Sequence, residues 1–350
     1  MLLASRQLVQ RTFTQLHKKL AFSARVAAKH SSLAQENYFE SAIERSFPEY
    51  SQFFTNNHIL SRIGRTPIIK IADNVFLKTE GENPTGSIKD RVALYVLLDK
   101  LRNGIVEDGT RLVLATSGSY GLSMYLIKAV VESYFNISIG LTVVTPRNYS
   151  IKPAIKTLEK KPDVLVKEES DDDIFDSDVS RGNELIYVDE NFDVAIRVAK
   201  KIGETENGVF IDQQHDESHV LSHQDTAEEI YHQLPDVTDV VLATGTGATA
   251  TGLFRFMPAS VRIHTRPANS GEIDGLTDPR KYKNYFDENR FFGYGTSFFT
   301  RTVASHYQRQ LMGSGKLSVG LSTGAALSLV NDIRSKNSDA VISVISASRY

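Results

Sequence analysis

One junction between an expected strand and an expected helix carries the sequence Glu82-Asn83-Pro84-Thr85-Gly86-Ser87-Ile88-Lys89-Asp90-Arg91. It follows the apolar, β-branched run Val75–Leu77 and precedes the helical spacing of Val92–Leu101. The proline and glycine favour a turn, and Ser87 is a good helix cap. The stretch therefore predicts a strand, a tight turn and a helix that begins close to Lys89.

Lys89 is the chemically active candidate in this junction. The positive end of the helix dipole and the neighbouring Arg91 both disfavour an ammonium ion, so the amine is expected to be more readily neutral and nucleophilic. The alternative is an ordinary surface lysine in a first helical turn, because lysine side chains are nearly always exposed.

The rest of the chain alternates between strand and helix patterns. Apolar runs predict strands at Ile68–Ile71, Val75–Leu77, Leu112–Leu114, Ile137–Val144, Val164–Val166, Val209–Ile211, Val240–Ala243, Val261–His264 and Val341–Ile345. Three-to-four-residue apolar spacing predicts helices at Val92–Leu101, Leu122–Val131, Val194–Ile202, Ala227–Leu234 and Ala325–Ile333. This alternation indicates an α/β protein whose mostly parallel sheets are covered by helices, with ligands bound where strands end and helices begin.

Three further segments rich in small and hydroxyl residues open helices, and the first two of them follow predicted strands. They read Ala115-Thr116-Ser117-Gly118-Ser119-Tyr120-Gly121, Thr244-Gly245-Thr246-Gly247-Ala248-Thr249-Ala250-Thr251-Gly252 and Gly320-Leu321-Ser322-Thr323-Gly324-Ala325-Ala326. Hydroxyls and backbone N–H groups at helix N-termini bind anions, so the first junction suits a carboxylate and the second a phosphate. The second is neither a P-loop nor a dinucleotide fingerprint. The alternative for all three is a set of ordinary turns and helix caps.

Composition excludes several classes of protein. The 350 residues are 41% hydrophobic and 23% charged, which rules out a wholly disordered chain. Cysteine is absent, which excludes disulfide scaffolds, thiolate nucleophiles and cysteine-ligated metals. The net charge of -2 gives no field that would recruit nucleic acid, and no apolar run is long enough to span a membrane.

Charge divides the chain unevenly. Residues 1–35 contain six basic side chains and no acid, so they carry +6 and the remainder carries -8. This pattern is typical of a mitochondrial transit peptide, and the alternative is a basic docking arm on a cytoplasmic protein. We expect an extension over 1–40, an N-terminal α/β lobe with Lys89 over 41–205, and a C-terminal α/β lobe with the phosphate loop over 206–350.

Two patterns offer metal sites, and we expect neither to hold a metal. His215, His219 and His223 are four residues apart and would share one face of a continuous helix. The acidic segment Glu168–Asp178 holds seven carboxylates, but it lacks the glycine turn of a calcium loop and is better interpreted as solvated surface.

The ordered motifs resemble those of the fold type II pyridoxal-phosphate enzymes, within them the cysteine synthase and cystathionine β-synthase branch. The resemblance runs from Ile63-Gly64-Arg65-Thr66-Pro67 to Ser322-Thr323-Gly324-Ala325, about three quarters of the chain, and is most specific over Asn83–Arg91. It implies two lobes of mostly parallel, twisted sheets flanked by helices, as in the tryptophan synthase β-like fold. It also implies a homodimer.

The resemblance assigns roles residue by residue. Lys89 would form the Schiff base with pyridoxal 5'-phosphate, and Ser322 would face its pyridine nitrogen. The cofactor phosphate would be held by Gly245, Thr246, Gly247, Ala248 and Thr249. The substrate carboxylate would be held by Thr116, Ser117, Gly118 and Gln214. Ser119 would approach the cofactor's 3′ oxygen, and Gly275 would line the mouth of the site.

The implied activity is β-replacement or β-elimination on a serine-type amino acid such as O-acetylserine, O-phosphoserine or serine. Lys89 would serve as the catalytic base, and the partner would be a small molecule. Ser119 stands where the branch usually has asparagine, Ala248 replaces a glycine, and Tyr120 is bulky. One alternative is a dehydratase or desulfhydrase of the same fold, and another, which Ser119 and Ala248 favour, is a cofactor-free homologue that acts as a binding protein.

Overall fold

The computed structural model describes residues 41–168, 182–189, 191–205, 207–269, 271–294, 297–313 and 317–349. The predicted extension over 1–40 and residues 169–178 of the acidic segment lie outside these ranges. Among the described residues, no helix is long and apolar enough to cross a membrane.

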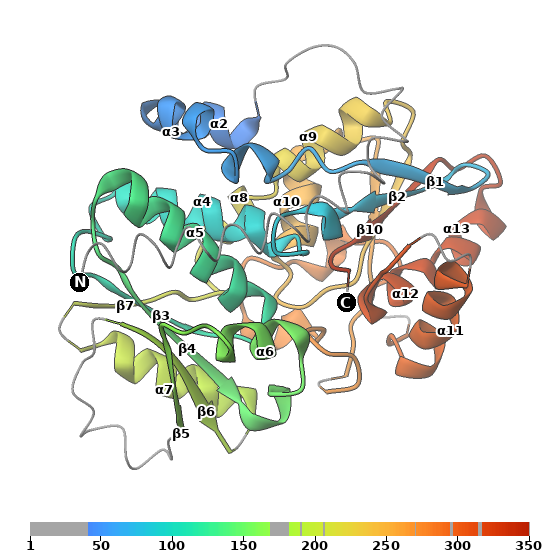
Figure 1. The fold of residues 1–350 in the computed structure, drawn as a ribbon. Helices are drawn as coiled ribbons and strands as arrows, with labels where there is room; N and C mark the ends of the chain where they lie inside the picture. The colour runs from blue at the N-terminus through green and yellow to red at the C-terminus, as the bar shows by residue number, and fades with distance from the viewer. Residues whose placement is uncertain are drawn as a thin grey trace.

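One sheet is parallel throughout, with the strand order β5-β6-β4-β3-β7. Its strands are β3 (Arg111–Ala115), β4 (Gly140–Pro146), β5 (Val164–Glu168), β6 (Asn183–Val188) and β7 (Gly208–Phe210). Around it lie α4 (Lys89–Arg102), α5 (Ser119–Phe135), α6 (Pro153–Glu159) and α7 (Phe192–Gly203). Leu112 and Leu114 pack toward α4 and α5, whereas Val113 and Ala115 pack toward α7. This alternation explains why both faces of the sheet are covered (Figure 1).

The second sheet has the order β1-β2-β10-β8-β9. Its strands are β1 (Ile68–Ala72), β2 (Val75–Thr79), β8 (Asp239–Val241), β9 (Arg262–His264) and β10 (Ile342–Ser346). Only the β1–β2 pair is antiparallel. Val344 of β10 packs with the side that carries α11 (Arg301–Met312), α12 (Leu321–Leu327) and α13 (Val330–Lys336). Ile345 packs with the side that carries α9 (Gln224–Gln233) and α10 (Ala248–Phe256).

The predicted α/β class with two mostly parallel, helix-flanked sheets is confirmed. The sheets are not continuous in sequence, because β1 and β2 join the sheet of β8, β9 and β10, and β7 joins the sheet of β3. The predicted parts 41–205 and 206–350 therefore each contribute strands to both sheets, and the predicted boundary does not separate them.

Several elements differ from the sequence prediction. Strand β6 and helices α6 and α11 were not predicted, nor were the short helices α2 (Ala42–Ser46), α3 (Ser51–Asn56) and α8 (Ser218–Leu221). The single helix expected over Ala325–Ile333 is two helices, α12 and α13. The hydroxyl of Ser328 donates to the carbonyl of Ala325 at 2.6 Å, and the N–H of Leu329 donates to Ala326 at 3.0 Å. These contacts tighten the chain into a turn between the two helices.

Candidate active site

A cavity of about 720 Å³ lies where strands of both sheets end. Its wall includes residues that follow the carboxyl ends of β3, β8 and β10. The predicted site residues in the wall are Lys89, Thr116, Ser117, Ser119, Gly245, Thr246, Gly247, Ala248, Thr249, Gly275 and Ser322. The carboxyl edges of parallel strands are the expected place for a ligand, so the fold gathers the four sequence junctions at one cavity.

The turn before Lys89 is held by hydrogen bonds from several segments. The Asp90 carboxylate accepts from the N–H of Thr85 at 2.7 Å and from the Ser123 hydroxyl of α5 at 2.6 Å. The N–H of Ile88 donates to the carbonyl of Ala347, just after β10, at 2.8 Å. Lys89 is the first residue of α4, and its position is therefore fixed from both sheets.

The amine of Lys89 faces the cavity without a hydrogen-bond or ion-pair partner among the described residues. The nearest recorded aromatic contact is the ring of Tyr120, whose centroid is 5.6 Å away. Burial lowers the pKa of Lys89 to about 8. The sequence prediction of a readily neutral amine is supported, but burial rather than the charge of Arg91 lowers the pKa, because two carboxylates compensate the Arg91 guanidinium.

This pKa predicts how Lys89 reacts with small amine-directed reagents. Labelling of Lys89 should rise with pH and reach half of its maximum near pH 8, because the neutral amine is the nucleophile. An ordinary lysine, with a pKa of about 10.4, would need a pH more than two units higher. Peptide mass spectrometry across a pH series measures the midpoint, and a midpoint near 10 would contradict the effect of burial.

The loop after β8, which was predicted to bind a phosphate, forms part of the cavity wall at the start of α10. Gly247 caps α10 with a φ of +91°, and no side chain could replace it without backbone strain. A Cβ on Gly245 would lie 2.4 Å from the carbonyl oxygen of Gly275, so the two segments meet through bare backbone. Ala248 is buried and its methyl group is accommodated in the wall.

Thr249 of this loop is supported by a histidine. Its hydroxyl is 3.0 Å from Nε2 of His223, whose Nδ1 is 3.3 Å from the hydroxyl of Thr226. Burial, followed by the charge of Lys89, lowers the pKa of His223 well below its ordinary value, so the ring is neutral. His223 is a supporting residue that the sequence interpretation did not identify.

The three histidines that suggested a metal site do not share a helix. Short α8 ends at Leu221, α9 begins at Gln224, and His223 lies between them. His215 is exposed and pairs with Asp212 at 3.0 Å, whereas His219 is buried against the ring of Tyr120. No group of three or more metal-type side chains occurs within the described ranges.

The loop after β3 carries the predicted carboxylate site. The hydroxyl of Thr116 accepts from the N–H of Gly118 at 3.1 Å, and Ser117 and Ser119 line the cavity. Gly118 itself is not in the wall.

Of the two glutamines after β7, the structure places Gln213 in the cavity wall, whereas the sequence predicted Gln214. Gln213 lies in the cavity wall and its amide donates to the carbonyl of Ala115, whereas Gln214 is not in the wall. The N–H of Gln214 donates to the Asp212 carboxylate at 2.8 Å. In an irregular segment, sequence alone does not decide which of two adjacent residues faces inward.

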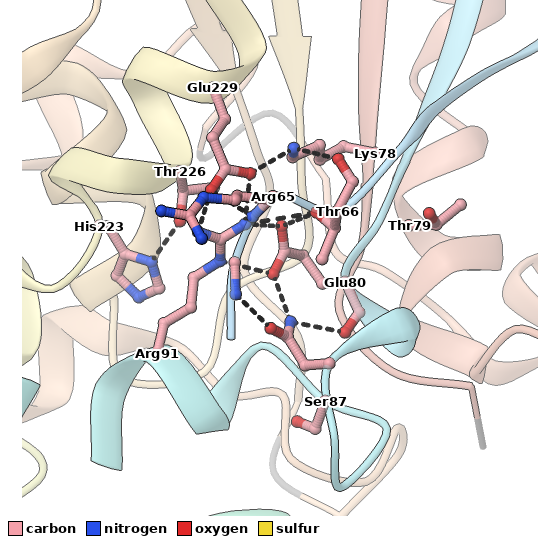
Figure 2. A network of polar contacts seen from close by, with 12 residues as sticks. Arg65, Thr66, Lys78, Thr79, Glu80, Ser87, Arg91, His223, Thr226 and Glu229 are labelled. Carbon is pink, nitrogen blue, oxygen red and sulfur yellow. Dashed lines mark hydrogen bonds and ion pairs between the residues drawn. The ribbon is translucent and has the colours of Figure 1, made fainter. Parts of the chain in front are cut away.

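A buried network of charges fixes the start of α4 (Figure 2). The Arg91 guanidinium donates to Glu80, in the 3-10 turn Glu80–Glu82 after β2, at 2.8 Å. It also donates to Glu229 of α9 at 2.7 Å. Lys78 of β2 donates to Glu229 and to the carbonyl of Thr66, both at 2.6 Å. The network therefore joins α4, β2 and α9 two residues beyond Lys89.

The network is balanced, with two cations and two carboxylates. Burial alone would raise the pKa of Glu229, but Arg91 and then Lys78 outweigh it and hold that pKa well below its usual range. Burial lowers the pKa of Lys78 more than its acidic neighbours raise it. Because each charge depends on the others, removing one leaves an unpaired charge in the interior.

Sequence interpretation missed a group of cations in the cavity wall. These residues are Lys152, Lys281 and Arg301. Lys152 follows β4, which was predicted as a strand, but it lies too far beyond the end of that strand for a junction motif to indicate it. Lys281 and Arg301 follow no predicted strand directly.

The fold and cavity define an α/β protein that presents a lysine amine and a glycine- and threonine-rich loop at a helix start, where the carboxyl edges of two sheets meet. The sequence profile of the family described as pyridoxal-phosphate dependent enzyme matches residues 59–268, more than half of the chain. The chain belongs to this family.

Its relatives include known enzymes. Cysteine synthase B of Escherichia coli (strain K12) is 26% identical over 309 residues, which cover 82% of this chain and 91% of that protein. Cystathionine beta-synthase of Dictyostelium discoideum is 30% identical over 266 residues, 71% of this chain and 47% of that protein. The crystal structure of a hydrogen sulfide-producing enzyme from Fusobacterium nucleatum shares the fold, with a TM-score of 0.68 and 21% identity over 84% of this chain and 98% of that one.

The residues in the cavity fit the cofactor after which the family is named. An aldehyde requires an amine, which Lys89 presents without a competing partner among the described residues. A phosphate requires N–H and hydroxyl donors, which residues 245–249 present at the start of a nine-residue helix. The cavity of about 720 Å³ is also within the size range of small-molecule sites, about 300–1,000 Å³.

Proposed function

We propose that this chain binds pyridoxal 5'-phosphate on Lys89 and catalyses β-replacement on a serine-type amino acid. The observation that carries the proposal is the unpartnered, half-buried amine of Lys89 in a cavity that also contains an anion-binding loop. Relatives named cysteine synthase and cystathionine beta-synthase support the same reaction class.

The residues that line the cavity would contact different parts of the cofactor and the substrate. The backbone and hydroxyls of Gly245, Thr246, Gly247, Ala248 and Thr249 would hold the phosphate. Ser322 would contact the pyridine nitrogen as a neutral hydroxyl, and Ser119 would approach the 3′ oxygen. Thr116, Ser117 and Gln213 would bind the substrate carboxylate, with Gly275 at the mouth.

The cofactor would supply electron withdrawal, which acidifies the α-hydrogen of the bound amino acid. Once the amine of the substrate has displaced Lys89 from the cofactor, the freed Lys89 amine would accept that proton, since it is substantially neutral near pH 8. Thr116 and Ser117 would keep the substrate carboxylate in place during this transfer, and the neutral Ser322 would add no charge at the ring nitrogen. The surrounding wall would limit access of water to the amine.

The reaction is tested by product analysis with O-acetyl-L-serine and sulfide. We expect cysteine to form only when sulfide is present. Pyruvate and ammonia formed without a nucleophile would assign β-elimination, the chemistry of a dehydratase or desulfhydrase, in place of β-replacement. Cofactor-loaded protein that converts none of the serine derivatives would overturn the proposal in favour of a binding role.

The phosphate loop gives a second test. We expect Gly245→Ala to weaken pyridoxal-phosphate binding by about tenfold or more, which corresponds to about 1.4 kcal/mol. The new methyl group would lie 2.4 Å from the Gly275 carbonyl and must displace the loop. Equilibrium titration followed by visible absorbance measures the affinity, with circular dichroism as the control for folding. Unchanged affinity in the folded variant would remove this loop from the cofactor site.

Location and assembly belong to the proposal as well. The acid-free, +6 charge of residues 1–35 supports delivery to the mitochondrion, which a fluorescent fusion of these residues would test. A fusion that stays in the cytoplasm would favour the docking-arm alternative.

The family resemblance supports a homodimer, and light scattering should then give about twice the 39.0 kDa of one chain.

A further inference from the structure

The cavity wall carries more positive charge than the proposed cofactor contacts use. Besides Lys89, it contains Lys152, Lys281 and Arg301, and its carboxylates are Asp193 and Asp274. These three additional cations come from three separate elements: Lys152 precedes α6, Lys281 lies in the 3-10 turn Pro279–Tyr282, and Arg301 begins α11. We call them the cationic rim.

Lys152 is a member of the rim whose ammonium has an aromatic ring beside it but no ion-pair partner among the described residues. Its side chain is half-buried, and its ammonium lies 3.5 Å from the centroid of the Tyr149 ring. No hydrogen bond or ion pair joins this ammonium to another described residue. Burial lowers the pKa of Lys152 to about 8, and the charge of Asp274 offsets this only in part. A bound anion would remove the cost of keeping this ammonium charged.

The position of Lys152 is next to the proposed carboxylate loop. Ala154 and Ile155, which follow two and three residues after Lys152, lie against Gly118. A Cβ atom placed on Gly118 would be 3.4 Å from the side chain of each. Pro153 and Ala154 line the same cavity as Ser117 and Ser119. An amino acid whose α-carboxylate binds this loop would therefore extend its side chain into a cavity that Lys152 also lines.

Arg301 is held in a defined orientation. Its Nε donates to the carbonyl of Glu272 at 3.0 Å, and its backbone N–H donates to the Glu272 carboxylate at 3.2 Å. For its terminal guanidinium nitrogens, no partner is found among the described residues. Lys281 stands over the ring of Tyr282, 5.0 Å from the centroid. Both cations add positive potential to that of Lys152.

We propose that the cationic rim, through Lys152, selects substrates whose β-substituent carries its own oxyanion, such as a phosphate ester. This inference rests on the proposed function, because it assigns the substrate class of the same cavity. A neutral ester would leave Lys152 without a counter-ion, whereas a dianionic group would pair with it. Lys152 is thus a specificity-determining residue that contacts the side chain of the amino acid.

The test compares two unreactive amino acids of similar shape. One is 2-amino-3-phosphonopropionate, whose phosphonate is anionic. Its C–P bond does not break, so the phosphonate is not a leaving group. The other is γ-methylleucine, which has a neutral tert-butyl group in the same place. Calorimetric titration of the purified full-length chain, saturated with pyridoxal phosphate, should show at least tenfold tighter binding of the phosphonate.

Variants distinguish the contribution of Lys152 to phosphonate binding from the contribution of the overall positive charge. Lys152→Met keeps the aliphatic part of the side chain. It should weaken binding of the phosphonate at least tenfold and change the affinity for γ-methylleucine by less than twofold. Lys152→Gln provides a second, polar replacement if the methionine variant does not fold. Lys156→Met removes an exposed charge from α6, outside the cavity wall, and should leave both affinities unchanged.

Each outcome decides the inference. Equal binding of the two ligands by the wild-type protein, or a preference that survives Lys152→Met, would overturn it. Failure of the proposed function is recognised separately, because the protein would then stay colourless with added cofactor. Calorimetry on that colourless protein would still measure the preference for the phosphonate. A yellow protein that forms cysteine from O-acetyl-L-serine and sulfide but lacks the preference would overturn the role of the rim and leave the proposed function intact.

Discussion

Lys89→Ala is expected to lower kcat/KM for the proposed replacement reaction by about a thousandfold or more. The substitution removes both the attachment point of the cofactor and the base that accepts the substrate proton, and positioned bases alone contribute about 10²–10⁴-fold. Among the described residues lining the cavity, Lys152 and Lys281 are the other lysines, and neither begins α4. Steady-state assays with O-acetyl-L-serine and sulfide measure the loss.

Lys156→Ala is the matched control for this experiment. Lys156 is exposed on α6 and lies outside the cavity wall, so activity should stay within twofold of wild type. If Lys89→Ala retained more than a tenth of the wild-type activity, another base would have to perform the reaction.

Arg91→Met is expected to lower the free energy of unfolding by about 3–5 kcal/mol, the usual loss when one partner of a buried ion pair is removed. The guanidinium contacts Glu80 and Glu229 at 2.7 to 2.8 Å, and the side chains of all three residues are at most 9% exposed. Without it, Lys78 is the remaining cation of the network for two buried carboxylates. Chemical denaturation measures the change.

An exposed ion pair provides the comparison. Lys70 pairs with Asp73 at 3.2 Å, but both side chains are more than half exposed. Lys70→Met should therefore change stability by less than about 1 kcal/mol. A loss below 1 kcal/mol for Arg91→Met as well would mean that the network does not hold α4 in place.

Sequence patterns were informative wherever local chemistry determines local structure. The junctions around Lys89, Thr116 and Gly245 each combine an apolar strand with small turn residues and a helix start, and the segment around Ser322 combines small residues with a helix start. Parallel strands bring such junctions to one edge, so their meeting at one cavity could be predicted. The pairing of β2 with β10 and the addition of β7 to the sheet of β3 depend on contacts between residues distant in sequence, which no local pattern records.

The details that were missed depend on burial and orientation. The low pKa of Lys89 results from its burial. Burial cannot be deduced from the position of Lys89 at the start of a helix or from the charge of Arg91. The inward position of Gln213 rather than Gln214 depends on a single residue of register after β7. Lys152 lies eight residues beyond the predicted strand end at Val144, too far for a junction motif.

The most direct test of the central claim is to locate the cofactor on the chain. Purified protein should be yellow, or become yellow when pyridoxal phosphate is added, and borohydride should fix the cofactor covalently. Digestion and mass spectrometry are expected to find it on the peptide that contains Lys89, and no such peptide should appear from Lys89→Ala. A colourless protein that stays unlabelled, or a label on Lys152 instead, would contradict the account.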